Sequence, residues 1–344
     1  RIVRRIHRTA ANSPTAMSNL PEAPATMPTP EVIHLATRGS ALALAQANQI
    51  LAQCRAACPE FQFAIKIIKT TGDKNLTASL ANPGALLPKG LFTKELEVAL
   101  LNGEADLAVH SLKDLPTELP DGLKLGATPM REDPRDVLVF PTHKVGVFDG
   151  PLPELPEGAT IATSSNRRKA QLLRLRPDFT IVEIRGNVGT RLRKVKEQPE
   201  LHATVLAAAG LKRLGFTIEE NGALAGDDVP EGIQTRFLTT EEMLPCVGQA
   251  AIGIETREND PRIDAICDKL NHSETLVCVT AERAFLRTTG GGCSTPVAAL
   301  AEIREATLSL RANSFIDDQF REFAGTGAAK DAAKLGADAA AALK

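Results

Sequence analysis

The sequence predicts an α/β protein with two helix-covered sheets, followed by a smaller α+β module. Three patterns lead to this fold class. Strand-like and helix-like segments alternate after residue 32 and again after residue 160, as in the βαβ units that build parallel or mixed sheets. After residue 274 the order changes to a helix, two alternating strand segments and an Ala-rich helix. A chain of 344 residues is long enough for two or three domains.

The first α/β unit is expected to begin near Val32. Ser40 is suited to cap a helix, and the apolar residues that follow it recur at helical spacing. Pro and Gly then interrupt the pattern before a second helix and a buried strand. The elements expected are a strand at 32–37, a helix after Ser40, a strand at 63–67, a loop at 76–90, a helix at 93–101 and a strand at 106–110.

The second α/β unit is expected over residues 160–216. Residues 129–160 are rich in Pro and Gly and indicate a crossing between domains, with the charged run 131–136 as a hinge. Residues 217–240 are acidic and Gly-rich, which favours a loop insertion. The elements expected are strands at 160–163, 180–184 and 203–208, a turn at 210–215, and a loop with a buried strand at 241–255.

The C-terminal part is expected to form the α+β module. Its elements would be a helix at 274–287, antiparallel strands at 296–301 and 306–312, and a helix at 328–343. The domains predicted are a tail at 1–31, a first domain from 32–130 and 245–268, a second at 131–244 and a third at 269–344.

Positive charge is concentrated between Thr160 and Lys194. Nine Lys or Arg against two acids make this stretch +7 in a chain that sums to −2. Its arginines lie at two strand-to-helix turns, where helix N-termini and the carboxyl ends of strands favour anions. A ligand with several carboxylates or phosphates would suit them. The alternative is a solvated basic helix face. The turn residues concerned are Ser164, Ser165, Asn166, Arg167 and Arg168 at the first turn, and Arg185, Gly186, Asn187 and Arg191 at the second.

Lys113 and Asp114 follow the buried strand at 106–110. A carboxylate in a cleft lined by cations can hold an ammonium group and move its proton, so the two residues form a candidate acid–base pair. The alternative is a surface turn, which is what most Lys-Asp pairs are. Gln249, after the run LPCVG, would reach the same crevice.

Cys293 differs from the other five cysteines because three glycines precede it. Such a loop can present a thiol for attachment or nucleophilic use, whereas the alternative is a small buried hydrophobe. That alternative suits Cys54, Cys267 and Cys278. The six cysteines form no dense framework, which indicates a reducing compartment. Neither Cys nor His residues have metal-ligand spacing, so no metal is predicted.

Several classes of protein are disfavoured by composition. No run of about 18 apolar residues exists, so no membrane span is expected. Trp and Tyr are absent and the remainder of the chain is acidic, which argues against nucleic-acid binding. The first 30 residues hold four Arg and one acid, a composition typical of an organelle transit peptide, with a disordered tail as the alternative. The expected location is therefore a plastid. If these residues are not a transit peptide, the expected location is the cytoplasm.

Taken together, many stretches resemble the porphobilinogen deaminase (hydroxymethylbilane synthase) family of the tetrapyrrole pathway. They occur in family order and cover most of residues 32–297. The matching stretches are ATRGSALALAQ (36–46), TTGDKN (70–75), KGLFTKELEVALL (89–101), DLAVHSLKDLP (106–116), REDPRDVLV (131–139), TSSNRRKAQ (163–171), RGNVGTRL (185–192), LAAAGLKRLG (206–215), LPCVGQAAIGIE (244–255), AERAFL (281–286) and GGCSTP (291–296).

The resemblance implies two doubly wound domains like those of periplasmic binding proteins, with the active site between them and a third domain carrying the cofactor. That cofactor is a dipyrromethane, joined by a thioether to the cysteine that Cys293 matches. Four porphobilinogens are added one at a time, each losing ammonia, and hydrolysis releases the linear tetrapyrrole, a precursor of haem and chlorophyll. The partners implied are porphobilinogen and the growing polypyrrole chain, and family members are mostly monomeric.

The resemblance also assigns residues. Asp114 matches the catalytic aspartate, which helps the amine leave and stabilises the cation that results. Forked guanidiniums suit the carboxylates of the pyrrole rings. The cofactor-binding positions implied are Lys113, Asp114, Thr163, Ser164, Ser165, Arg167, Arg168, Arg185, Gly186, Asn187 and Arg191. The substrate-binding positions implied are Arg38, Ser40, Lys89, Arg185, Arg191 and Gln249.

The main alternative is a non-catalytic polyanion-binding protein of the periplasmic type. The same two-domain clamp would serve it, but it would need neither Cys293 nor Asp114.

Overall fold

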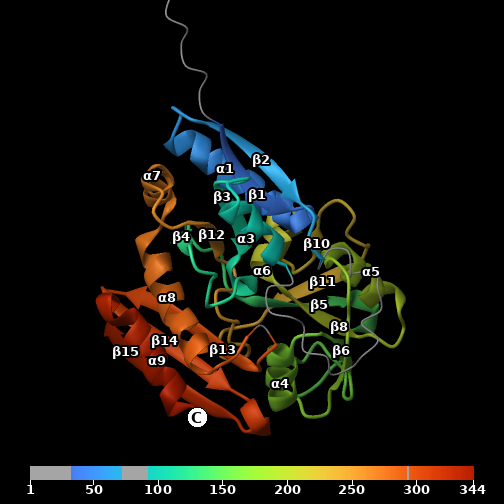
Figure 1. Cartoon of the computed structure of the whole chain (residues 1–344). Coiled ribbons are helices and arrows are strands. Elements are labelled where there is room, and N and C mark those ends of the chain that lie inside the picture. The colour runs from blue at the N-terminus through green and yellow to red at the C-terminus, as the bar shows by residue number, and fades with distance from the viewer. Residues whose placement is uncertain (1–31, 72–91, 293) are drawn as a thin grey trace, which may run out of the picture.

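The computed structural model describes residues 32–71, 92–292 and 294–344 (Figure 1). Two five-stranded mixed sheets and a three-stranded antiparallel sheet each organise one domain. Figure 1 shows the first domain at the top, the second at the lower right and the third at the lower left. The predicted fold class, two α/β domains with a smaller α+β domain, is confirmed.

The first domain surrounds a sheet of order β2-β1-β3-β12-β4. Strands β1, β2 and β3 are parallel, whereas β12 runs antiparallel to both of its neighbours. Ser40 caps α1 by accepting a hydrogen bond from the Ala43 N–H, as predicted. The elements are β1 (Val32–Arg38), α1 (Ala41–Ala57), β2 (Gln62–Ile68), α3 (Lys94–Leu101), β3 (Leu107–Ser111), β4 (Leu123–Ala127), β12 (Ile252–Arg257) and α7 (Pro261–Leu270).

The second domain surrounds a sheet of order β11-β5-β8-β6-β7. Strand β6 is parallel to β7 and β8, whereas β5 runs antiparallel to β8 and β11. The elements are β5 (Asp136–Pro141), β6 (Thr160–Ala162), α4 (Asn166–Leu175), β7 (Thr180–Val182), α5 (Val188–Glu197), β8 (Ala203–Ala207), α6 (Ala208–Arg213), β9 (Thr217–Ile218), β10 (Leu224–Ala225) and β11 (Ile233–Phe237).

The two large sheets share one plan. Strands β2-β1-β3 correspond to β7-β6-β8, and in each sheet the next strand is antiparallel and lies directly after a crossing between domains. Strand β5 is the first after the chain leaves the first domain, and β12 is the first after it returns. The carboxyl ends of the parallel strands in each sheet are where such α/β sheets bind ligands.

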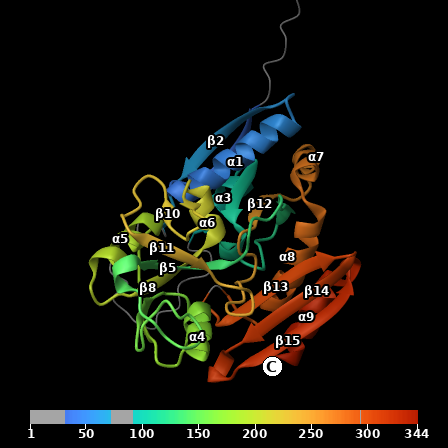
Figure 2. The ribbon, with the colours of Figure 1, turned by 180° about the vertical axis from the view of Figure 1, so that it is seen from behind.

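The third domain packs two helices on a three-stranded sheet. Helices α8 and α9 contact each other and the sheet, and their shared core holds Phe285, Leu310 and Leu335. Figure 2 shows this domain from behind, with the start of α4 next to the end of its sheet. The elements are α8 (Ser273–Thr288), β13 (Val297–Arg304), β14 (Thr307–Ser314), β15 (Arg321–Ala328) and α9 (Ala332–Ala342).

Three sequence-based predictions about this part of the chain are wrong. Residues 217–240 are not a loop insertion, because they form the β9–β10 hairpin and the edge strand β11, which pairs along β5. The turn expected at 210–215 lies largely within helix α6. The crossing expected at 129–160 is shorter, because β5 begins at Asp136 and is buried along its whole length.

Other elements were not anticipated. Helix α7 contributes Ile263, Ile266 and Leu270 to the core of the first domain, two residues beyond the expected boundary. Strand β15 completes the third sheet, and the strand expected at 180–184 ends at Val182. The predictions for the tail at 1–31, the loop at 76–90 with Lys89, and Cys293 lie outside the described residues.

Two expectations concern the helices and the cysteines. Over the described ranges, no helix combines the length and the apolar character that crossing a membrane requires. Cys54, Cys267 and Cys278 are buried, as expected for small core residues. Burial raises the pKa of the Cys54 and Cys267 thiols to about 12.

We expect Gly336→Ala to destabilise the third domain. A Cβ at Gly336 of α9 would lie 2.1 Å from the Ala281 carbonyl oxygen of α8, so the helices must separate, at a cost of about 1–3 kcal/mol. The control is Gly210→Ala in α6, where a Cβ meets nothing within 4 Å. That change should stabilise by about 0.5–1 kcal/mol through helix propensity. Urea unfolding of both variants would contradict the prediction if their midpoints moved in the same direction.

Candidate functional site

Asp114 lies at the carboxyl end of β3, in a short 3₁₀ turn. Leu112 at the start of the turn is buried and would touch a Cβ placed on Gly248 or Gly253. This apolar anchor leaves Asp114 exposed beside Lys113. The expected delivery of both residues to the end of a buried strand is therefore confirmed.

Asp114 lies on the walls of two cavities. The first has a volume of about 170 Å³ and collects side chains from all three domains. The second, of about 70 Å³, lies at the ends of β1 and β3 in the first domain. The first is lined by Lys113, Asp114, Ser165, Arg167, Arg168, Cys246, Val247, Gln249, Leu286, Gly292, Thr295 and Val297. The second is lined by Arg38, Ser40, Leu42, Ala43, Gln46, Phe92, Thr93, Val109, His110, Ser111 and Asp114.

The first cavity meets the start of helix α4, which follows β6 as predicted. Ser165 is the N-cap, and its hydroxyl accepts from the Arg168 N–H at 3.3 Å. The Thr163 hydroxyl accepts from the Ser165 N–H, and the Ser164 hydroxyl donates to the Ile184 carbonyl at 2.7 Å. Thr163 and Ser164 therefore shape the turn through backbone contacts, whereas Ser165 also lines the cavity.

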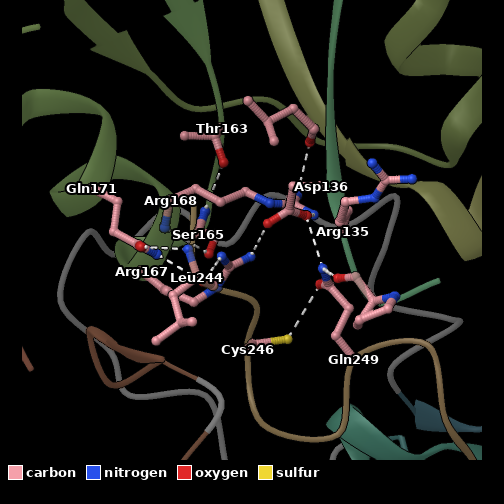
Figure 3. Close-up of polar contacts among 12 residues, drawn as sticks. Arg135, Asp136, Thr163, Ser165, Arg167, Arg168, Gln171, Leu244, Cys246 and Gln249 are labelled. Carbon is pink, nitrogen blue, oxygen red and sulfur yellow. Dashed lines mark hydrogen bonds and ion pairs between the residues drawn. The ribbon is translucent and has the colours of Figure 1, made fainter. Parts of the chain in front are cut away.

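Asp136 is the centre of a buried network behind this helix start (Figure 3). Its two oxygens accept from Arg167 at 2.8 Å and from Arg168 at 2.7 Å, and Gln249 donates to it at 3.0 Å. Burial disfavours the charge of Asp136, but the two guanidiniums outweigh burial and hold its pKa at about 2. The carboxylate therefore neutralises part of the positive charge that the sequence concentrates here.

This network changes two expectations. Asp136 was assigned to a charged hinge, but it is fully buried at the start of β5. Arg167 and Arg168 were expected to point their guanidiniums into the crevice. They do line the first cavity, but they are only 4% and 8% exposed and are paired with Asp136. Each also donates to a backbone carbonyl, of Leu244 and Val205 respectively. In the described part of the chain, each thus uses two of the five N–H groups of a guanidinium.

The second basic turn lies between β7 and α5. Gly186 has φ of +115°, which favours glycine, and Asn187 caps α5 by accepting from the Thr190 N–H. Arg191 donates from Nε to the Gly186 carbonyl, and burial together with the charge of Arg168 lowers its pKa. Arg185 is half exposed and pairs with Glu183 at 3.2 Å. Neither arginine is among the residues that line the two cavities.

The third domain is fixed against the first cavity on both sides of position 293. Asn166 at the start of α4 donates to the Ser294 carbonyl at 2.8 Å, and Gly292 and Thr295 line the cavity. The fully buried Glu282 of α8 makes a bidentate pair with Arg131 in the interdomain crossing. Cys293 itself lies outside the described residues. Its neighbour Gly292 lines the first cavity, as Asp114 does, and its neighbour Ser294 accepts a hydrogen bond from the start of α4.

Sequence reasoning did not identify several residues of this site. Asp136 directly precedes the apolar run VLVF, and an acid at the entry of such a strand is a signal of a buried charge partner. Gln46 and Ser111 exchange hydrogen bonds in the second cavity. His110 lines that cavity and contacts Glu255. Within the described ranges, no cluster of His, Cys, Asp or Glu has the geometry of a metal site.

We expect Asp136→Asn to lower the stability of the chain by about 3–5 kcal/mol, because it leaves two buried guanidiniums without a charged partner. Asp133→Asn is the control, since Asp133 and Arg135 are both more than a third exposed, and their pair is worth about 0–1 kcal/mol. Urea unfolding at pH 7 measures both. Equal effects of the two substitutions would contradict the buried-network assignment.

The pairing of Asp136 with the two arginines predicts that the chain loses stability in acid. The folded pKa of Asp136 lies below its ordinary value of 3.8, so its contribution is complete above that value and is lost as the pH falls towards about 2. Wild type should lose stability over that range, and Asp136→Asn should lose less.

Comparison with known proteins identifies the family of the chain. Residues 33–265 match the porphobilinogen deaminase dipyrromethane cofactor binding domain, and residues 276–344 match the porphobilinogen deaminase C-terminal domain. The chain is 48% identical over 277 residues to a porphobilinogen deaminase of Syntrophus aciditrophicus, covering 80% of this chain and 83% of that protein. With the enzyme of Syntrophobacter fumaroxidans it shares 42% identity over 312 residues, 90% of this chain and 93% of that protein.

A further similarity, to a solved structure, is much weaker. The reduced form of the OxyR regulatory domain from Pseudomonas aeruginosa aligns with a TM-score of 0.37 and 15% identity, over 70% of this chain and 94% of that one. That level is too low to bear on function, whereas the sequence matches span nearly the whole described chain. The chain therefore belongs to the porphobilinogen deaminase family.

Proposed function

We propose that the two cavities that meet at Asp114 form the active site, the larger holding the dipyrromethane and the smaller admitting porphobilinogen. The family reaction, which this transferase of porphyrin biosynthesis carries out, joins four porphobilinogens with loss of ammonia and then releases the linear tetrapyrrole. The observation that carries the assignment is the position of Asp114 on the walls of both cavities. A proton-handling group belongs where the two reacting molecules meet.

The larger cavity fits a small aromatic group that bears carboxylates. Arg167 and Arg168 line it, and the Nε of each is buried without a partner among the described residues. Their guanidiniums therefore retain hydrogen-bonding capacity after pairing with Asp136. Lys113 and the helix N-terminus at Ser165 add positive potential. When bound, the dipyrromethane supplies the pyrrole carbon to which the first porphobilinogen is joined.

The smaller cavity offers a matched environment to the incoming substrate. Arg38 lies at its wall beside Ser40, and its guanidinium also stacks on Phe92 at 4.2 Å. Stacking on an aromatic ring and pairing with a carboxylate are both common roles of a guanidinium. Lys89, Gln249, Arg185 and Arg191 complete the proposed substrate contacts. Arg185 and Arg191 would serve rings further along the chain, since they lie at the second basic turn.

Asp114 is proposed to act at two steps. Beside the substrate's ammonium group its carboxylate orients the amine and favours departure of ammonia. Once ammonia has left, the same carboxylate stabilises the positive charge that spreads over the pyrrole ring and accepts its N–H. The exposed position of Asp114 at the end of β3 suits this, since among the described residues no hydrogen bond occupies its oxygens in the way that Arg167 and Arg168 occupy those of Asp136.

The remaining expectations stay predictions. We propose a monomer that binds neither nucleic acid nor membrane. No organelle is proposed, because the relatives named above are bacterial and residues 1–31 lie outside the described chain. The polyanion-binding alternative is not favoured by the family membership, and it requires neither an attached cofactor nor turnover.

Attachment through Cys293 is tested by intact-mass measurement. We expect active holoprotein to carry an adduct of two pyrrole units that Cys293→Ser abolishes. Cys246→Ser is the matched control, because Cys246 lines the same cavity and should keep the adduct. Loss of the adduct in Cys246→Ser instead would place the attachment at Cys246. Active wild type without any adduct would exclude a covalently attached cofactor.

Asp114→Asn is expected to lower turnover about 10²–10⁴-fold, because an amide neither handles a proton nor stabilises a cation as a carboxylate does. Steady-state formation of hydroxymethylbilane from porphobilinogen measures this. Asp121→Asn, an exposed aspartate seven residues later, should leave turnover unchanged. Near-normal turnover in Asp114→Asn would remove this residue from the mechanism.

A further inference from the structure

A buried histidine–glutamate pair lies next to Asp114. His110 of β3 and Glu255 of β12 are on neighbouring antiparallel strands, and Nε2 of the imidazole is 2.9 Å from Oε2 of Glu255. The two side chains are 4% and 0% exposed. Buried polar groups of this kind are costly unless they are paired, so the arrangement is a specific feature of the first domain.

Glu255 anchors one side of the imidazole. Nε2 faces the carboxyl group, and among the described residues Nδ1 of His110 has no hydrogen-bond partner. His110 also lines the smaller cavity together with Asp114, Arg38 and Ser40. An imidazole held by a carboxyl group at one nitrogen and unbonded at the other has the arrangement in which a histidine can act as a base.

Charged groups from two helices surround the pair. Arg283 of α8 lies close enough to Glu255 for the carboxyl group to oppose the fall in the arginine's pKa, which burial and Arg287 lower to about 10. Burial together with the charge of Glu255 raises the pKa of Glu97 on α3, and the charge of His110 opposes that rise. The pair therefore has a guanidinium on one helix and a carboxyl group on another as neighbours.

The reaction needs a second proton acceptor beside Asp114. In each addition the carbon–nitrogen bond of porphobilinogen breaks and ammonia leaves. A carbon–carbon bond then forms at the free α-carbon of the terminal ring, and that carbon must lose its hydrogen as a proton before the ring is aromatic again. Asp114 stabilises the cationic partner throughout, so its basicity is reduced when the proton has to leave.

We propose that His110, oriented by Glu255, is a catalytic residue whose Nδ1 accepts this α-carbon proton where the terminal ring reaches from the larger cavity to the smaller one at Asp114. The inference rests on the active site proposed above. Glu255 stabilises the imidazolium that forms, as a carboxylate does for a catalytic histidine. The proton then passes to the released ammonia, which departs as ammonium, so each cycle returns His110 to its neutral form and the bonds and charges balance.

A kinetic isotope effect tests this role. The substrate is porphobilinogen carrying deuterium at its free α-carbon, the position from which the proton is lost. His110→Gln is expected to lower kcat about 10²–10⁴-fold with little change in KM, and to raise the isotope effect above the wild-type value because proton loss becomes rate-limiting. Glu255→Gln should act in the same direction but less strongly. Added imidazole should restore part of the turnover of His110→Ala.

The controls separate this inference from a structural role and from the proposed function. His143→Ala, an exposed histidine of the second domain, should leave both kcat and the isotope effect unchanged. If the variants at 110 and 255 keep the two-pyrrole adduct but show a wild-type isotope effect and no imidazole rescue, His110 is structural only. If His110→Gln fails to fold, the isotope effect measured with Glu255→Gln is the deciding result. Wild type without an adduct would instead overturn the active site itself.

Discussion

The architecture of the site depends on one buried carboxylate. Asp136 accepts from Arg167, Arg168 and Gln249, so the start of α4, the first strand of the second domain and the segment returning to the first domain meet at one residue. Two guanidiniums without this partner could not be buried at acceptable cost. With it, the helix start is held rigid and its N-cap faces the cavity. The electrostatic character of the site depends on the charge and the N–H groups of the two arginines that remain after this pairing.

A second set of buried polar contacts joins the three domains around one cavity. Arg131 in the interdomain crossing pairs with Glu282 of α8, and Glu282 also accepts from the Gly248 and Ala301 N–H groups. Helix α8 and strand β13 of the third domain are therefore attached to the same crossing segments that connect the two α/β domains. The proton chemistry is separated from this scaffold: Asp114 is exposed at a strand end, and His110 is anchored on Glu255 within the first sheet.

Much of the fold could be predicted because its signals are local. Ser40 caps a helix as predicted, Ser165 and Asn187 cap helices at the two predicted strand-to-helix turns, and the alternating strands appear near the expected bounds. Predictions failed where local composition and tertiary pairing disagree. Residues 233–237 lie in an acidic, Gly-rich stretch, yet they form an edge strand because β5 offers an unpaired side. The sequence indicates that Arg167 and Arg168 bind an anionic ligand, and only the distant Asp136 shows that both also belong to a buried ion-pair network.

The sequence by itself determined the fold class, the family, and the residue types brought to the ends of β1, β3 and β6, because helix caps, strand periodicity and long motifs are properties of neighbouring residues. Tertiary structure decided which of those charged groups are paired within the protein. Asp136 is 31 residues from Arg167, and Glu255 is 145 residues from His110. Pairing across such separations is set by strand order and burial, so the division between paired and available groups exists only in the folded chain.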